Sequence, residues 1–137
     1  MEVNYVLEAY GLKKKYKGFE LNIPELKIPK GYATALIGEN GAGKTTLLNI
    51  LAGIQLQYQG EIRYYGKYTD KDREEIPEVK ERMGYTAPGS YYVSQWRLGQ
   101  IAELNELLFS NFHRERFERW CKELAVGAEG WDPKKKV

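Results

Sequence analysis

A glycine-rich segment at residues 38–46 carries the residue types that bind a chain of phosphates. Its sequence, GENGAGKTT, fits the pattern G-x-x-x-x-G-K-[ST]. Its three glycines lack a Cβ atom, so the backbone can turn through positive φ and bring its amides against phosphate oxygens. Lys44 adds an ammonium that can reach the terminal phosphates, and Thr45 offers a hydroxyl to a bridging Mg²⁺. The candidate residues are Gly38, Asn40, Gly41, Ala42, Gly43, Lys44, Thr45 and Thr46, with Lys44 the catalytic candidate and Thr45 the candidate metal ligand.

The flanking sequence predicts the two elements that must position this loop. Residues 32–37 form a short apolar run with the composition of a buried strand. Four apolar residues that follow recur at helical spacing: Leu47, Leu48, Leu51 and Ile54. The loop amides would then lie at a helix N-terminus, where a partial positive charge attracts anions. Strand, loop and helix in this order form the context that the motif requires for nucleotide binding.

Composition narrows the classes of protein that this chain can be. Among 137 residues, 21 Lys and Arg face 19 Asp and Glu. This balance does not favour a nucleic-acid partner. The single cysteine, Cys121, excludes an internal disulfide and suits a reducing compartment. No apolar run approaches the ~20 residues that span a bilayer, and the first residues are not a signal peptide. We expect a cytoplasmic protein whose membrane role, if any, depends on a partner.

The residues before the loop predict a small antiparallel sheet. Apolar and polar residues alternate over 3–10, which indicates a half-buried strand. Residues 11–18 are rich in lysine and bounded by glycines, and they predict a turn. Residues 19–23 alternate again, and the apolar pair at 26 and 28 suggests a third strand. Residues 1–31 are therefore expected to form an antiparallel β subdomain.

The residues after the loop predict further strands and then helices. Residues 61–65 and 83–87 have the composition of strands, and the charged residues 67–82 predict a surface loop with a short helix. From Trp96 onward the apolar period becomes helical, and the apolar stripes are assigned to a core. One stripe comprises Ile101, Leu104, Leu107 and Leu108, and the other Phe117, Trp120, Cys121 and Leu124. Within one domain over 1–137, we expect a nucleotide-binding core at 32–89 and a helical subdomain at 90–137.

Several of these features together resemble the ATP-binding subunit of ABC transporters. They are the loop, Tyr16 followed by Phe19, the sequence Gly-Glu-Ile at 60–62, and Met-Gly-Tyr at 83–85. The loop alone is shared by many NTPases, whereas the other features at these spacings are typical of this family. Residues 111–117 and 132–137 look most like its bacterial exporter-type branch.

The resemblance implies a fold, ligands and partners. The fold would be α/β, a P-loop NTPase of the ABC ATPase type with an antiparallel β subdomain and the start of a helical subdomain. Tyr16 would stack on adenine, and residues 38–46 would bind the phosphates and Mg²⁺ of ATP. Residues 90–125 would meet a transmembrane permease on the inner face of the membrane. A second ATP-binding subunit would close over the nucleotide head to tail.

Two departures from the family pattern concern catalysis. The glutamine that the family places after the strand at 83–86, near Mg²⁺ and the attacking water, is replaced by Pro88, and Gln95 lies too far along. The sequence also contains no glycine-rich signature, metal-holding Asp, base-like Glu or switch His. The lone His113 is expected on the surface. We therefore expect the N-terminal part of an ATPase that does not hydrolyse ATP by itself. Because the resemblance places the neighbours of the strand at 33–37 outside this sequence, we also expect that the chain alone folds poorly, swaps strands, or is a record of a longer protein.

Three functions remain open from the sequence. The first is a transport ATPase subunit that powers export through a membrane partner; a non-transport ABC ATPase with the same N-terminal motifs is an alternative to it. The second is a nucleotide-binding or regulatory module that holds ATP without hydrolysing it. The third is a small P-loop kinase, which would need arginines directed at the phosphates. The arginines at 114, 116 and 119 instead alternate with glutamates as ordinary helix-surface pairs.

Overall fold

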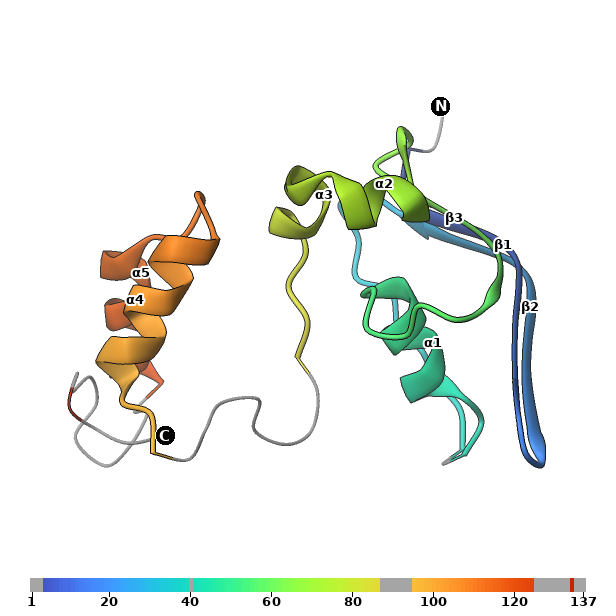
Figure 1. Ribbon diagram of the computed structural model, residues 1–137, viewed down its shortest axis with the longest axis horizontal. Helices are drawn as coiled ribbons and strands as arrows, with labels where there is room; N and C mark the ends of the chain where they lie inside the picture. Colours follow the sequence, from blue (N-terminus) through green and yellow to red (C-terminus); the bar gives the residue numbers. More distant parts are fainter. Residues whose placement is uncertain (1–3, 40, 87–94, 125–133, 135–137) are drawn as a thin grey trace. The chain divides into compact units, whose positions relative to one another are not determined.

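A computed structural model describes residues 4–39, 41–86, 95–124 and 134 of the chain. The chain divides into two compact units, Met1–Tyr85 and Thr86–Val137. The described residues of the first unit form a β-sheet and three helices, and those of the second form two helices (Figure 1). The candidate phosphate loop lies in the first unit.

The sheet of the first unit has four antiparallel strands in the order β2-β1-β3-β4. The strands are β1 (Tyr5–Tyr16), β2 (Phe19–Pro29), β3 (Gln59–Tyr64) and β4 (Tyr68–Thr69). The long hairpin of β1 and β2 bends, and helix α1 (Lys44–Leu51) lies on the inner side of the bend (Figure 1). The expectation of an α/β protein with an antiparallel β subdomain is confirmed.

The lysine-rich turn predicted at residues 11–18 is wrong. Strand β1 continues to Tyr16, and its lysines pair with β2 in a regular ladder, for example Lys15 with Glu20. The actual turn is Lys17-Gly18, where Gly18 has a φ of 83°. The ladder persists because Leu12 is fully buried, so the side chains that alternate with it face solvent. The two strands predicted over 19–28 form the single strand β2, because its pairing with β1 is continuous from Ile28 to Phe19.

A β-bulge interrupts the pairing of β1 with β3. The register of this pair breaks between Tyr10 and Lys13, and Gly11 there has a φ of 61°. Gly60 of β3 packs against the bulge so closely that a Cβ atom on it would lie 2.5 Å from the Gly11 carbonyl oxygen. The predicted strand at 61–65 is thus confirmed, but it begins two residues earlier than expected and ends at Tyr64.

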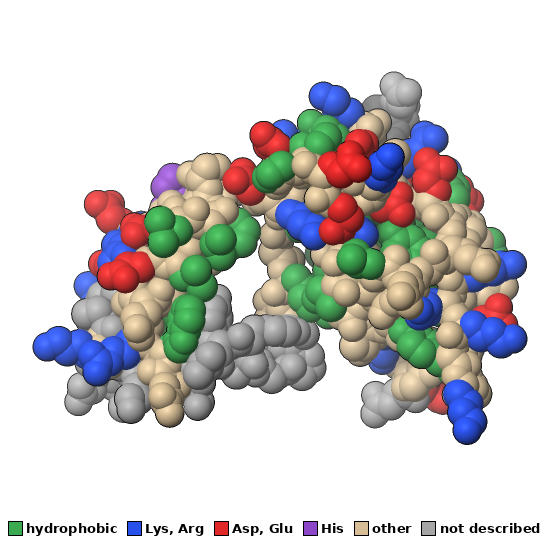
Figure 2. All heavy atoms as spheres, viewed as in Figure 1, with side chains coloured by type: hydrophobic (Ala, Val, Ile, Leu, Met, Phe, Trp, Pro, Cys, Tyr) green, Lys and Arg blue, Asp and Glu red, His purple; other side chains and the backbone are tan. Residues whose placement is uncertain are grey.

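The core of the first unit lies between the sheet and α1. Leucines and isoleucines of the helix face apolar residues that alternate along the strands, as the spacing of 3.6 and 2 residues requires. The buried residues are Ala9, Leu12, Leu21, Leu47, Ile50, Leu51, Ile62, Tyr64 and Val79. Charged side chains of both signs are interspersed over the visible face of this unit (Figure 2).

The predicted surface loop at 67–82 is more ordered and more buried than expected. It forms β4, helix α2 (Asp70–Glu75) and helix α3 (Pro77–Glu81). Thr69 and Asp72 form a reciprocal capping box at the start of α2, and Pro77 occupies the first turn of α3. Arg73 and Val79 are buried, so this segment closes one side of the core.

The strands predicted at 32–37 and 83–87 are absent from the described residues. A strand is held by hydrogen bonds to a neighbouring strand, and no described strand pairs with either segment. The side chain of Ile37 is consequently 90% exposed and that of Tyr32 is 78% exposed. Residues 83–86 are likewise irregular, and the Tyr85 hydroxyl instead donates to Asn49 Oδ1 in α1 at 2.6 Å.

The second unit contains α4 (Leu98–Leu108) and α5 (Arg114–Glu123). Its buried residues are Leu98, Ile101, Ala102 and Cys121. Four residues assigned to core stripes are instead exposed in the structure: Leu107, Leu108, Trp120 and Leu124. Their burial was wrongly predicted because helical spacing alone does not show how wide the packed face is. Within the described ranges, no helix has the length and apolar character of a membrane span.

Candidate phosphate-binding site

The described residues of the loop before α1, which are 38, 39 and 41–43, have the backbone features that phosphate binding requires. Gly41 and Gly43 adopt left-handed φ values of 85° and 96°, which side-chain-bearing residues rarely adopt. The Ala42 amide donates to the Glu39 carbonyl oxygen at 3.1 Å and closes the turn. The first hydrogen bond of α1 runs from the Leu47 amide to the Gly43 oxygen. The amides of residues 44–46 therefore have no partner inside the helix and are available to an anion.

Gly43 is fixed by its neighbours as well as by its backbone. A Cβ atom at this position would lie 2.6 Å from Phe19 Cζ and 3.1 Å from Leu21 Cδ1, both in β2. The sheet therefore touches the loop exactly where α1 begins. Only glycine satisfies both the close approach and the positive φ here.

The side chains of the loop surround a small open pocket. The pocket has a volume of about 310 Å³, and its lining residues are Phe19, Gly41, Gly43, Lys44, Thr45 and Thr46. The Lys44 ammonium donates to the Gly38 carbonyl oxygen across the loop. A triphosphate would compete with that neutral acceptor, because an ammonium bonds more strongly to an anion. The pocket therefore suits the charge and the donor set of a nucleotide's terminal phosphates.

Tyr16, the candidate for base stacking, lies at the end of β1 and is 42% exposed. Its ring stacks on Phe19, with 6.4 Å between centroids and 23° between planes. The Lys14 ammonium lies 5.4 Å from the centroid of the same ring. Since Phe19 also lines the phosphate pocket, one aromatic side chain connects Tyr16 to the loop.

The structure thus brings together most of the residues that sequence predicts for the site. Gly38 and residues 41–46 share one loop, and Tyr16 reaches it through Phe19. Asn40 and Pro88 lie outside the described residues. His113 is exposed at the residue before α5, as expected. In the part of the chain that the structure describes, no cluster of three His, Cys, Asp or Glu side chains could hold a metal.

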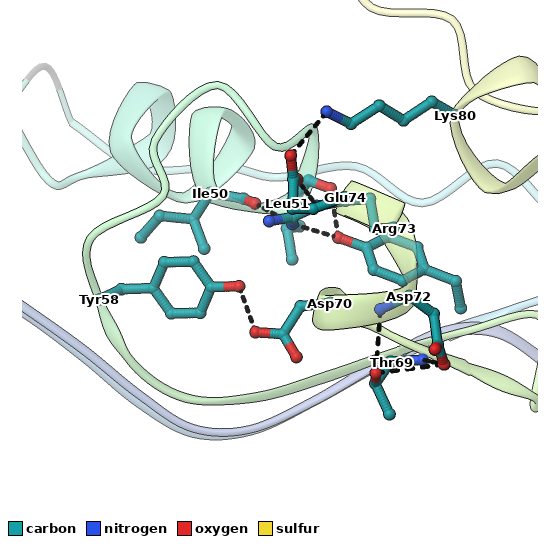
Figure 3. A network of polar contacts seen from close by, with 10 residues as sticks. Ile50, Leu51, Tyr58, Thr69, Asp70, Asp72, Arg73, Glu74 and Lys80 are labelled. Atoms are coloured by element: carbon teal, nitrogen blue, oxygen red, sulfur yellow. Dashed lines mark hydrogen bonds and ion pairs between the residues drawn. The ribbon is translucent and has the colours of Figure 1, made fainter. Parts of the chain in front are cut away.

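Sequence reasoning missed a polar network at the opposite end of α1. Arg73 of α2, only 2% exposed, donates to the Ile50 carbonyl oxygen at 3.0 Å and to the Tyr64 hydroxyl at 2.8 Å (Figure 3). Its Nε also donates to Glu74 Oε1 at 2.7 Å. Burial lowers the pKa of Arg73, but hydrogen bonds to Glu74 and Tyr64 raise it by more, so the guanidinium remains charged. Its charged residue type had indicated a surface position, and no local pattern signals this burial.

A phosphate loop at the start of a helix, packed on an antiparallel sheet, defines a nucleotide-binding protein of the P-loop class. The family model for ABC transporters matches residues 21–129, which is most of the chain. The chain therefore belongs to the ABC transporter family, and specifically to its ATP-binding domains.

Relatives with assigned names agree with this family. TupC, the ATP-binding protein of a tungstate uptake system in Peptoclostridium acidaminophilum, is 40% identical over 74 residues, which cover 53% of this chain and 35% of TupC. The sulfate/thiosulfate import ATP-binding protein CysA of Escherichia coli (strain K12) is 44% identical over 68 residues, which cover 49% of this chain and 18% of CysA. The chain thus spans about a third of the length of TupC and under a fifth of CysA.

A solved structure supports the fold. The chain resembles a structure of the ATP binding subunit of an ABC transporter with a TM-score of 0.67 at 22% sequence identity. The likeness covers 88% of this chain and 49% of the other. At this identity it shows the fold alone. The named relatives are uptake or import proteins, so the predicted exporter-type branch is not confirmed.

Proposed function

We propose that this chain binds Mg-ATP and supplies ATP-binding machinery to a transport ATPase. The observation that carries the proposal is the open loop at the start of α1, with its left-handed glycines and with helix amides that have no partner within α1. The amides and Lys44 would hold the β- and γ-phosphates, and Thr45 would hold Mg²⁺. Tyr16 would stack on the adenine ring. ATP supplies the phosphoryl group whose transfer to water drives transport.

The loop amides and Lys44 would contribute binding and charge stabilisation. The amides of 44–46 point to one end of α1, so they and the helix dipole favour the same negatively charged group. Lys44 neutralises charge on the terminal phosphate, where the negative charge is distributed in the transition state of phosphoryl transfer. Because Lys44 reaches the Gly38 oxygen in the structure, it must exchange this partner for phosphate when ATP binds.

Our proposal includes binding without turnover by the 137-residue chain itself. Phosphoryl transfer also needs a group that orients the attacking water. Pro88 stands where the family resemblance places a glutamine, and proline has no side-chain acceptor. This expectation leaves room for the second function, a module that holds ATP without hydrolysing it. Measuring ADP formation by the protein purified from its own cells decides between a transport ATPase, which would produce ADP, and a module that only holds ATP.

The partners and location in the proposal follow from the family. ATP binding would be coupled to transport through a transmembrane permease. A second ATP-binding subunit, arranged head to tail, would complete the nucleotide site. The protein would then lie at the cytoplasmic face of the membrane. The direction of transport remains a prediction: residues 111–117 resemble exporters, whereas TupC and CysA are named for uptake and import.

A titration with Mg-ATP tests the proposal. The amide signals of residues 41–46 should shift on binding, and Lys44→Ala should weaken affinity at least about tenfold, the scale of one charge-assisted hydrogen bond. Lys71→Ala, which removes an exposed lysine of α2, is the matched control and should bind as the parent does. Unmoved loop amides at saturating Mg-ATP in the parent would contradict the proposal.

A further inference from the structure

Arg73 is the one charged side chain that is buried among the described residues of this protein. A buried guanidinium needs partners for its donors, because charge is costly to remove from water. Three partners surround it: the Ile50 carbonyl oxygen, the Tyr64 hydroxyl and the Glu74 carboxylate (Figure 3). Lys80 also donates to Glu74, at 3.0 Å, so the carboxylate is itself held in place.

This network reaches the final residues of α1 through two hydrogen bonds, one from Arg73 and one from Tyr64. Arg73 donates to the carbonyl oxygen of Ile50, which also accepts from the Gly53 amide. The hydroxyl of Tyr64 donates to the carbonyl oxygen of Leu51 at 2.7 Å. Carbonyl groups in a last helical turn lack donors within the helix, and a cation there faces the negative end of the dipole. Arg73 therefore holds this end of the helix by hydrogen bonds and by charge.

The chain leaves specific room for this guanidinium. Gly53 follows α1 with a φ of 77°, and a Cβ atom on it would lie 2.8 Å from Arg73 Nε. The Tyr64 hydroxyl has one partner on each side, since it accepts from Arg73 and donates to Leu51. The residues that surround the Arg73 guanidinium thus come from α1, from β3 and from the turn that follows α1.

We propose that Arg73 is a positioning residue for the phosphate loop and acts through α1. The proposal rests on the proposed function for its ligand, Mg-ATP. Helix α1 has eight residues, so its two ends lie only about 12 Å apart at 1.5 Å per residue. In a helix this short, a change in orientation at Ile50 and Leu51 also moves the amides of residues 44–46. Binding groups need placement within about 0.5 Å, which supporting residues provide.

Two variants test the proposal with little change in packing. Arg73→Lys keeps the charge but loses the planar fork that reaches three acceptors. Tyr64→Phe removes only the hydroxyl. Arg63→Lys is the matched control, since the exposed side chain of Arg63 in β3 bonds to Glu61, two residues away on the same strand. Hydrogen exchange of the α1 amides and the Kd for Mg-ATP are measured at a temperature where circular dichroism shows every variant to be folded.

We expect both test variants to speed exchange across α1 and to raise the Kd about threefold to tenfold, as for the loss of one hydrogen bond. Arg63→Lys should match the parent in both measurements. An unchanged Kd, whether or not exchange becomes faster, would overturn the proposal, because a purely structural residue lowers stability without moving the loop. If Arg73→Lys does not fold, Tyr64→Phe decides alone.

A failure of the proposed function gives a different pattern. In that case the parent itself would show no titration with Mg-ATP. The backbone amide shifts of residues 41–46 in the ligand-free variants would then decide about Arg73. Shifts that move in Arg73→Lys and Tyr64→Phe but not in Arg63→Lys would support the positioning role, and unmoved shifts would overturn it.

Discussion

The ring of Phe19 fills the space that a side chain on Gly43 would need, since a Cβ atom there would lie 2.6 Å from Phe19 Cζ. The same ring stacks on Tyr16 at 6.4 Å between centroids. One residue of β2 thus contacts both the start of α1 and the candidate base-stacking tyrosine. The hairpin and the phosphate loop are therefore in direct contact through this ring.

Gly43→Ala should prevent Mg-ATP binding and destabilise the first unit. The methyl group would meet a rigid ring, and the left-handed φ of 96° costs a non-glycine residue about 1–2 kcal/mol. Gly41→Ala is the matched control, because its φ of 85° carries the same strain but its Cβ atom would have nothing within 4 Å. Thermal melting should show a larger loss for Gly43→Ala. Equal losses in the two variants would show that the contact with Phe19 is unimportant.

Tyr16→Ala should weaken the binding of Mg-ATP and leave the binding of magnesium tripolyphosphate unchanged. Loss of base–aromatic stacking costs about 1–3 kcal/mol, or roughly 5- to 150-fold in affinity. Tyr16→Phe keeps the ring and should bind both ligands like the parent. Isothermal titration calorimetry with the two ligands separates the base from the phosphates. Equal weakening for tripolyphosphate would place Tyr16 at the phosphates and not at adenine.

Gly60→Ala should separate β3 from β1 at the bulge. A Cβ atom there would lie 2.5 Å from the Gly11 carbonyl oxygen and 2.8 Å from that of Tyr10, and backbone atoms cannot move aside easily. Gly66→Ala supplies the control, with a φ of 68° and no atom within 4 Å of the added methyl. We expect about 1–2 kcal/mol for Gly66→Ala and a larger loss for Gly60→Ala by chemical denaturation. A smaller loss at Gly60 would contradict this account of the bulge.

Glu74→Gln should lower stability at neutral pH and have little effect in acid. Burial raises the pKa of Glu74, but hydrogen bonds from Lys80 and Arg73 lower it by more, to below its usual 4.5. The carboxylate therefore contributes its full stabilisation above about pH 4.5 and loses it as the pH falls through the folded-state pKa. The melting temperatures of the parent and of Glu74→Gln should differ at pH 7 and converge toward pH 3. Glu75→Gln, on the same helix, is the control and should follow the parent throughout. A constant difference between parent and Glu74→Gln would exclude this role.

The phosphate loop and α1 could be predicted because their information is local. The spacing of the glycines, Lys44 and Thr45 defines the loop, and the leucines that follow recur at helical period. The alternation that predicts β1 is equally local. The family resemblance, now confirmed by the match over 21–129, extended these local features to most of the chain.

Other features depend on contacts that no local pattern carries. The lysines at 13–15 favoured the prediction of a turn, yet the buried Leu12 and the pairing with β2 keep these lysines in a β-ladder. Arg73 reads as a surface residue, yet its acceptors come from Ile50 and Tyr64, 23 and 9 residues away. Residues 32–37 have strand composition, but a strand forms only where a neighbour pairs with it. Tertiary context decided each of these cases.

The two arms of the phosphate loop are secured to different degrees in the described structure. The arm that begins α1 is anchored in the core through Leu47, whereas residues 33–37 on the other arm are exposed and have no cross-strand hydrogen bonds to described residues. A triphosphate held by Lys44 and the loop amides would bridge these arms. Its measured affinity would therefore include any cost of fixing this exposed segment as well as the strength of the contacts.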